Sequence, residues 1–148
     1  MIRYSSDVSI ARAPSDVFGA LLDQDLYGQW TEMVDTRFDG PGEPLAGTKG
    51  RFRLPSGPMA GEYEMRISTL DRDRRLVIEI DHPKMAWTSN VSLEPIDAGT
   101  RMTYAGEIRL RGWRRILEPV MGGEVRKGEA HEAERFKALL ESEAEVRP

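Results

Sequence analysis

The sequence predicts an α+β fold, in which one long C-terminal helix packs on the apolar face of a seven-stranded antiparallel sheet. Seven segments alternate between apolar and polar residues, which is the period of strands with one buried face. Short turns separate most of these segments, so neighbouring strands should run antiparallel. A sheet that is apolar on one side needs one cover, and the amphipathic residues 119–143 can supply it.

The first predicted elements are a strand over residues 2–11 and two short helices after it. Along the strand, Tyr4, Ser6, Val8 and Ile10 share one face. A helix should start near Pro14, because proline fits the first turn, where its missing N–H costs nothing. The second short helix is predicted over about residues 25–30. The first helix presents an inner face made of Val17, Phe18, Leu21 and Leu22.

Six further strands are predicted between Met33 and Leu110, each marked by a row of inward-facing residues. The turns between them include 55–58, 71–74 and 97–99. His82 ends one strand, and the glycine-rich residues 40–47 are expected to form a loop at the rim of a cavity. The inward rows are Val34, Thr36 and Phe38; Phe52 and Leu54; Tyr63, Met65 and Ile67; Leu76, Ile78 and Ile80; Trp87, Ser89, Val91 and Leu93; and Met102, Tyr104, Gly106, Ile108 and Leu110.

The long helix predicted over residues 119–143 has a gap in its apolar stripe. At about 100° per residue, Gly128 lies on the edge of the stripe, and Glu129 and Glu132 project from the same side. A stripe with a gap and carboxylates predicts a cavity beneath the helix in place of a filled core. The stripe itself consists of Met121, Val125, Ala133, Phe136, Leu139 and Leu140.

The environment of the two carboxylates follows less directly from the pattern. Glu129 is predicted to be a solvated edge residue, because its neighbours Arg126 and Ala130 lie away from the stripe. Glu132 is nearer the centre, and both a buried and a solvated position stay open for it. A buried carboxylate needs a partner or a raised pKa, and neither is visible in a sequence.

Composition limits the classes of function. A length of 148 residues predicts one domain, residues 1–148, and the absence of cysteine excludes disulfides and thiolate metal sites. The formal charge of −4 argues against a general nucleic-acid binder. No apolar run approaches the roughly 20 residues of a membrane span, and no signal peptide is evident, so a cytoplasmic location is expected. The sequence predicts no metal site and no cofactor, and it leaves open a monomer or a homodimer.

The predicted order of elements resembles the helix-grip fold of the START-like (SRPBCC) superfamily. The branch it resembles most is the polyketide cyclase/dehydrase and lipid-transport group. That resemblance implies a curved sheet gripping the last helix, with a cavity between them for an apolar or aromatic small molecule. The group shares no catalytic set that could be transferred here. The matching features are residues 10–18 (IARAPSDVF), Asp23 with Tyr27 and Trp30, and residues 136–141 (FKALLE).

Three functions are therefore considered. The first is binding of a hydrophobic small molecule, such as a polyketide, quinone or lipid. The second is a cyclase or dehydratase in which Glu132 is the base and Tyr63 or Tyr104 donates to the developing enolate. The third is a protein-interaction module similar to chaperone activators. The predicted ligand-binding residues are Tyr63, Met65, Ile78, Trp87, Ser89, Tyr104, Gly106, Val125, Gly128, Glu132 and Phe136.

Overall fold

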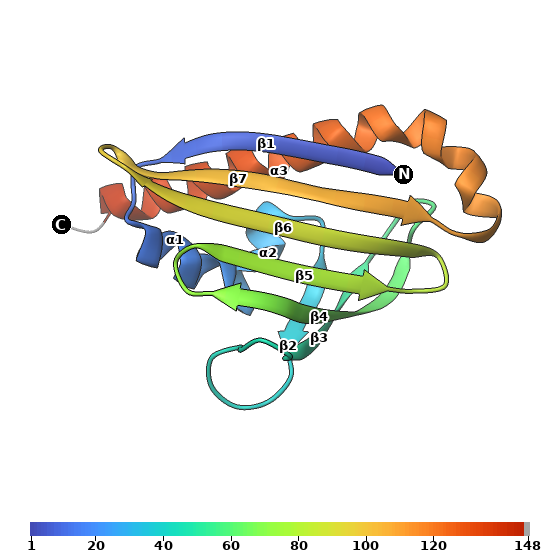
Figure 1. Ribbon diagram of the computed structural model, residues 1–148, viewed down its shortest axis with the longest axis horizontal. Coiled ribbons are helices and arrows are strands. Elements are labelled where there is room, and N and C mark those ends of the chain that lie inside the picture. The colour runs from blue at the N-terminus through green and yellow to red at the C-terminus, as the bar shows by residue number, and fades with distance from the viewer. Residues whose placement is uncertain (147–148) are drawn as a thin grey trace.

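The computed structural model describes residues 1–146 and confirms the predicted α+β architecture. Seven antiparallel strands form one open sheet with the order β1-β7-β6-β5-β4-β3-β2 (Figure 1). The strands are β1 (Ile2–Ile10), β2 (Val34–Phe38), β3 (Lys49–Leu54), β4 (Gly61–Asp71), β5 (Arg75–Asp81), β6 (Met85–Ile96) and β7 (Gly99–Leu110).

The alternating sequence pattern becomes a two-faced sheet. In β1 the even-numbered residues from Ile2 to Ile10 point inward, and all of them except Ser6 are buried. Register pairs Tyr4 with Gly106 and places the inward residues of neighbouring strands side by side. A bulge between Ile67 and Thr69 interrupts the pairing of β4 with β5. Bulges increase twist and bend a strand, which helps the sheet to curve.

The chain crosses the inner face of the sheet between its two edge strands. The helices α1 (Pro14–Leu21), η1 (Gln24–Leu26) and α2 (Tyr27–Trp30) make this crossing from β1 to β2. The Asp23 side chain accepts a hydrogen bond from the backbone N–H of Asp25, which caps η1. Tyr27 then donates its hydroxyl to the carbonyl of Leu21 at 2.6 Å, and this bond ties the two helical segments together.

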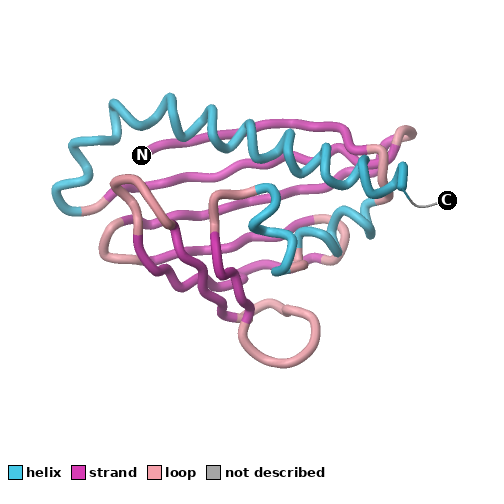
Figure 2. Tube along the Cα trace, turned by 180° about the vertical axis from the view of Figure 1, so that it is seen from behind, coloured by secondary structure: helices cyan, strands magenta, loops and turns pink. Residues whose placement is uncertain are grey.

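The long helix α3 (Glu118–Val146) lies along the inner side of β1 and β7, as Figure 2 shows from behind the sheet. Polar contacts attach it to β1 at several points. Arg126 donates to the carbonyl of Arg3 at 3.0 Å, and Lys137 donates to the carbonyl of Ser9 at 2.6 Å. The short helix η2 (Gly112–Leu117), which the sequence pattern did not predict, leads from β7 into α3.

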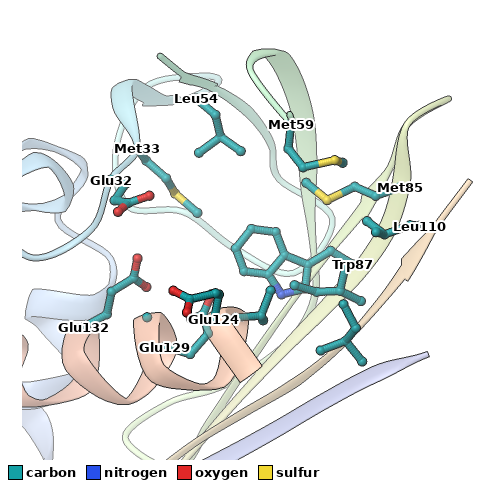
Figure 3. A pocket seen from close by; sticks show the side chains of 14 residues that line it. Glu32, Met33, Leu54, Met59, Met85, Trp87, Leu110, Glu124, Glu129 and Glu132 are labelled. Carbon is teal, nitrogen blue, oxygen red and sulfur yellow. The ribbon is translucent and has the colours of Figure 1, made fainter. Parts of the chain in front are cut away.

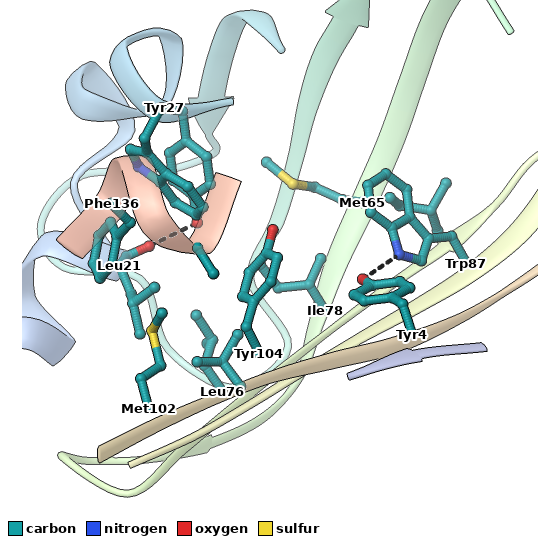
Figure 4. Close-up of a cluster of buried hydrophobic side chains, with 14 of the residues drawn as sticks. Tyr4, Leu21, Tyr27, Met65, Leu76, Ile78, Trp87, Met102, Tyr104 and Phe136 are labelled. Atoms are coloured by element: carbon teal, nitrogen blue, oxygen red, sulfur yellow. Dashed lines mark hydrogen bonds between the residues drawn. The ribbon is translucent and has the colours of Figure 1, made fainter. Parts of the chain in front are cut away.

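The apolar core lies where α2, α3 and the sheet meet. Phe136 of α3 is fully buried, and its ring centroid is 4.7 Å from that of Trp30. Trp30 in turn packs edge-on against Tyr104 of β7. Figure 4 shows Phe136 and Tyr104 among the surrounding aliphatic and aromatic side chains. This cluster joins the C-terminal half of α3 to the sheet.

Two sequence-based expectations about space are wrong. A glycine in an inward-facing row removes a side chain where the helix or a ligand would come close, but a Cβ at Gly106 would lie 2.3 Å from the Tyr4 hydroxyl oxygen. The Tyr4 side chain occupies that space. Residues 40–47 were expected at the cavity rim, but they form a loop that projects from the sheet between β2 and β3 (Figure 1) and line neither inner cavity.

Candidate functional site

A cavity of about 320 Å³ lies between α3, the sheet and the segment before β2. Figure 3 shows that its wall divides into an apolar side and an acidic side. The apolar side comes mainly from the strands and their ends, whereas three of the four acidic residues come from α3. The lining residues are Ile2, Met33, Leu54, Met59, Met85, Trp87, Ile108, Leu110, Val125 and Gly128, with Glu32, Glu124, Glu129 and Glu132.

Trp87 is the largest side chain on the apolar side. Its indole Nε1–H donates to the Tyr4 hydroxyl at 3.0 Å, which fixes the orientation of the ring. Met33, Met59 and Met85 surround it (Figure 3). Methionine side chains are flexible and polarizable, so they adapt to ligands of different outline. This half of the cavity suits an apolar or aromatic body.

The acidic side depends on the helical spacing of α3. Glu129 and Glu132 are three residues apart and therefore lie on adjacent turns of the same face. The Tyr104 hydroxyl, which projects from β7, donates to Glu132 Oε2 at 3.1 Å. Glu32 approaches from the opposite side, in the segment between α2 and β2 (Figure 3).

Glu129 is buried, with 8% of its surface exposed, so the prediction that it is a solvated edge residue is wrong. In the sequence its helical neighbours Arg126 and Ala130 point away from the stripe. However, α3 covers the cavity as well as the sheet. The cavity extends past the apolar stripe of the helix, so residues beside the stripe are also covered. Glu132 is partly buried and lies in the cavity wall. Both carboxyl groups therefore meet the cavity.

Burial and mutual repulsion alter the protonation of this pair. Loss of hydration, followed by the charge of Glu132, raises the pKa of Glu129 to about 9. Burial also raises the pKa of Glu132, but hydrogen bonds from Glu129 and Tyr104 and the charge of Arg135 oppose that increase. Glu129 therefore holds a proton at neutral pH, whereas the increase at Glu132 is partly offset by these contacts.

A protonated Glu129 makes stability depend on pH, and Glu129→Gln should reveal it. The folded protein keeps a proton that the unfolded chain releases between pH 4.5 and 9, so stability should fall as pH rises through that window. The slope is at most about 1.4 kcal/mol per pH unit. Urea denaturation at pH 5, 7 and 8.5 should show the stability advantage of Glu129→Gln over wild type widening with pH.

The control for this experiment is Glu134→Gln, which removes an exposed carboxylate from the same helix. Its stability should follow the wild-type protein at every pH. If Glu129→Gln instead runs parallel to wild type across the whole range, Glu129 does not retain a proton in the folded state.

A second, smaller cavity of about 30 Å³ lies deeper in the core. Trp87 and Met33 line both cavities, so they form part of the partition between them. Its polar groups are few, and Tyr104 presents its hydroxyl toward Glu132 in the larger cavity. The other residues around it are Leu21, Tyr27, Trp30, Thr31, Met65, Leu76, Ile78, Ile80, Ser89 and Val91.

The structure separates the predicted ligand-binding residues into three groups. Trp87, Val125, Gly128 and Glu132 line the large cavity. Met65, Ile78, Ser89 and Tyr104 line the small one, which Trp87 also borders. The third group, Tyr63, Gly106 and Phe136, lines neither of the two.

Tyr63 shows why an inward-facing tyrosine need not face a ligand. Its ring stacks on Phe52 at a centroid distance of 5.4 Å, and its hydroxyl donates to the carbonyl of Met59. The centroid of the His82 ring lies 4.4 Å from that of Tyr63, and His82 directly follows the end of β5, as predicted for a residue at a strand end. The hydroxyl is therefore satisfied inside the protein.

Sequence patterns missed the part of the site that comes from the strand ends and from the segment before β2. Glu32 and Met33 stand outside any periodic element, and Met59 lies in the turn between β3 and β4. Glu124 belongs to α3 but looked like an ordinary polar helix residue. The only signal that could have found part of this set was the number of methionines, seven in the chain.

Two further findings concern the described part of the chain. Within residues 1–146, no cluster of acidic and histidine side chains has the arrangement that would hold a metal ion. The described helices also include none with the length and apolarity to cross a membrane.

Comparison with known proteins supports the same architecture. Residues 1–141 match the family model described as polyketide cyclase / dehydrase and lipid transport. No curated protein matches the chain.

Solved structures of similar fold include a protein from Nitrosomonas europaea, with 18% identity and a TM-score of 0.71 over 97% of this chain and 96% of that one. A protein from Bacillus halodurans has 15% identity and a TM-score of 0.71 over 95% and 99% of the two chains. DynU16, from the dynemicin biosynthetic locus, has 14% identity and a TM-score of 0.70, over 95% of this chain and 48% of its own. At these identities the likeness concerns the fold alone.

Proposed function

The chain belongs to the polyketide cyclase / dehydrase and lipid transport family, and from this premise we propose that it binds a hydrophobic or aromatic small molecule in the cavity under α3. The class includes polyketides, quinones and lipids. One observation carries the proposal: a hollow of about 320 Å³ has an apolar wall around Trp87 and a few polar groups on the opposite side. Cavities of this size and composition are typical of small-molecule sites.

Calorimetric titration with 1-naphthalenemethanol, a neutral two-ring aromatic alcohol, tests this proposal. The rings should pack against Trp87 and the methionines, and the hydroxyl should reach the carboxyl groups of α3. Saturable binding of one molecule per chain is expected. A heat signal that does not reach saturation would indicate only weak adsorption to the surface and would contradict a defined binding site.

A second candidate is a cyclase or dehydratase, and the Glu129–Glu132 pair is the observation that favours it. In this scheme Glu132 acts as the base in its ionised form and takes a proton from the carbon next to a ketone. The proton on Glu129 then stabilises the oxygen of the enolate that forms. The enolate carbon attacks a second ketone of the same chain, and the new C–C bond closes the ring. The alkoxide that forms takes up the proton held by Glu132, and this hydroxyl then leaves as water with a hydrogen from the neighbouring carbon. The Tyr104 hydroxyl already donates to Glu132, so its part is to position that carboxylate.

Replacing Glu132 by Gln separates catalysis from binding. If the pair acts in cyclisation, Glu132→Gln should lower the turnover of a linear poly-β-ketone thioester about 100-fold or more, because a general base contributes that much. Binding of 1-naphthalenemethanol should change far less, and Glu134→Gln should alter neither. Unchanged turnover in Glu132→Gln would remove the base role and leave ligand binding as the function.

A further inference from the structure

We propose that the cavity selects apolar ligands whose polar end is a protonated amine, and that it rejects carboxylate ligands of the same shape. This inference specifies the ligand class of the binding function proposed above and rests on that function. It depends on which kinds of polar atom face the cavity, on their number, and on the one acceptor that has no partner.

The polar groups that face the cavity are almost all acceptors. Four carboxyl groups line it, and none of its lining residues is lysine, arginine or histidine. Trp87 is the one lining side chain with an N–H group, and that group is already given to the Tyr4 hydroxyl. A ligand that brings another acceptor, such as a carboxylate, would therefore meet acceptors and negative charge.

The Glu129 carboxyl group carries a proton at neutral pH, yet one of its two oxygens has no partner within residues 1–146. Only 8% of the residue's surface is exposed, and its Oε2 has no hydrogen-bond partner among the described residues. The printed hydrogen bond of the Tyr104 hydroxyl goes to Glu132 Oε2, so it does not reach this oxygen of Glu129. A buried acceptor without a partner is unfavourable, so a ligand donor at this point would be stabilised.

The charges around the pair leave the cavity acidic. Arg135 lies near enough to Glu132 to lower its pKa, but it does not line the cavity. Across the cavity, Glu32 faces the pair, and Glu124 follows the same wall of α3 (Figure 3). An ammonium group offers three N–H donors and one positive charge, so it can contact several of these carboxyl groups at once.

The apolar side supplies the other half of the selection. Trp87, Met59 and Met85 lie across the hollow from Glu32 and Glu132 (Figure 3), so a ligand with one apolar end and one cationic end matches both sides. A small inorganic cation would match only the acidic wall, and the carboxyl groups lack the arrangement of a metal site. The geometry therefore points to an amphiphilic amine.

Three probes that share one ring system test the proposal: 1-naphthylmethylamine, 1-naphthalenemethanol and 1-naphthoic acid. Calorimetry at pH 7 with wild-type protein should show the amine binding roughly tenfold tighter than the alcohol or better, since hydrogen bonds between charged groups are stronger than those of a neutral donor. The acid should bind weakest. The double variant Glu129→Gln/Glu132→Gln should bring the amine to within about threefold of the alcohol.

The matched control is Glu134→Gln, which removes one exposed negative charge from the same helix without touching the cavity. It should leave the order of the three probes unchanged. If the alcohol binds as tightly as the amine, or the acid binds as tightly as either, the amine preference is overturned while the ligand-binding function survives. If none of the three probes binds, the ligand-binding function itself is overturned. The wild-type comparison decides the matter even if the double variant does not fold.

Discussion

Gly128→Leu is expected to abolish binding of 1-naphthalenemethanol while the protein stays folded. Gly128 lines the cavity from α3, and a Cβ built on it meets no heavy atom within 4 Å. A leucine side chain would therefore extend into space that the ligand needs and displace nothing. Leucine is also a better helix former than glycine by roughly 0.8 kcal/mol, so the helix should gain stability.

The measurement is calorimetric titration of both proteins, with thermal unfolding as a check of the fold. Gly123→Leu is the matched control, because Gly123 is an exposed residue of the same helix with equally open surroundings and does not line the cavity. Affinity should drop at least 100-fold in Gly128→Leu and stay within about twofold of wild type in Gly123→Leu. Equal affinity in the two variants would place the ligand elsewhere.

Phe136→Ala is expected to cause the largest loss of stability among single substitutions in α3. The Phe136 side chain is fully buried against Trp30 at the place where the helix joins the core. Removing a buried phenylalanine typically costs about 3–5 kcal/mol, because apolar contacts are lost and a cavity remains. Urea denaturation should show a lower midpoint with an unchanged slope.

Lys127→Ala provides the comparison within the same helix. Lys127 is exposed, and such substitutions usually change stability by less than about 0.5 kcal/mol. A loss below about 1 kcal/mol in Phe136→Ala would mean that α3 is not anchored through this residue. The ligand-binding wall of the helix would then need another support.

The fold was predictable because its signals are periodic. In β1, β6 and β7 apolar and polar residues alternate along the sequence, and buried and more exposed residues alternate in the same way. The apolar stripe of α3 packs on the apolar face of the sheet. The short helix η2 was not predicted, because Trp113 and Ile116 are exposed and give no amphipathic pattern. The type of each predicted element thus followed from the spacing of its buried residues. The exception is η2, which buries little of its side-chain surface.

The site was only partly predictable, because the residues that line a cavity do not recur at a regular spacing in the sequence. Glu132 and Gly128 were found as irregularities in the stripe of α3, and both line the cavity. Glu129 was misjudged because a helical wheel shows the direction of a side chain but not how far the covering surface extends. Glu32 and Met59 come from irregular segments that only the folded chain brings to the cavity.

The remaining hypothesis, a protein-interaction module similar to chaperone activators, predicts a filled interior. The hollow beneath α3 and the buried Glu129 give no support to that expectation. A protein that used only its outer surface would gain stability from a leucine in place of Glu129, since burying a carboxyl group is costly. Acidic groups in this position have a physical reason if they meet a ligand.

The indole N–H signals of the three tryptophans give the most direct test of where a ligand binds. Trp87 lines the cavity, whereas 62% of the Trp113 surface is exposed on η2. In a nitrogen–proton NMR titration with 1-naphthalenemethanol, the Trp87 signal should shift and saturate while the Trp113 signal stays in place. A shift confined to Trp113, or an unmoved Trp87 signal at saturating ligand, would contradict the central claim that the hollow under α3 is the binding site.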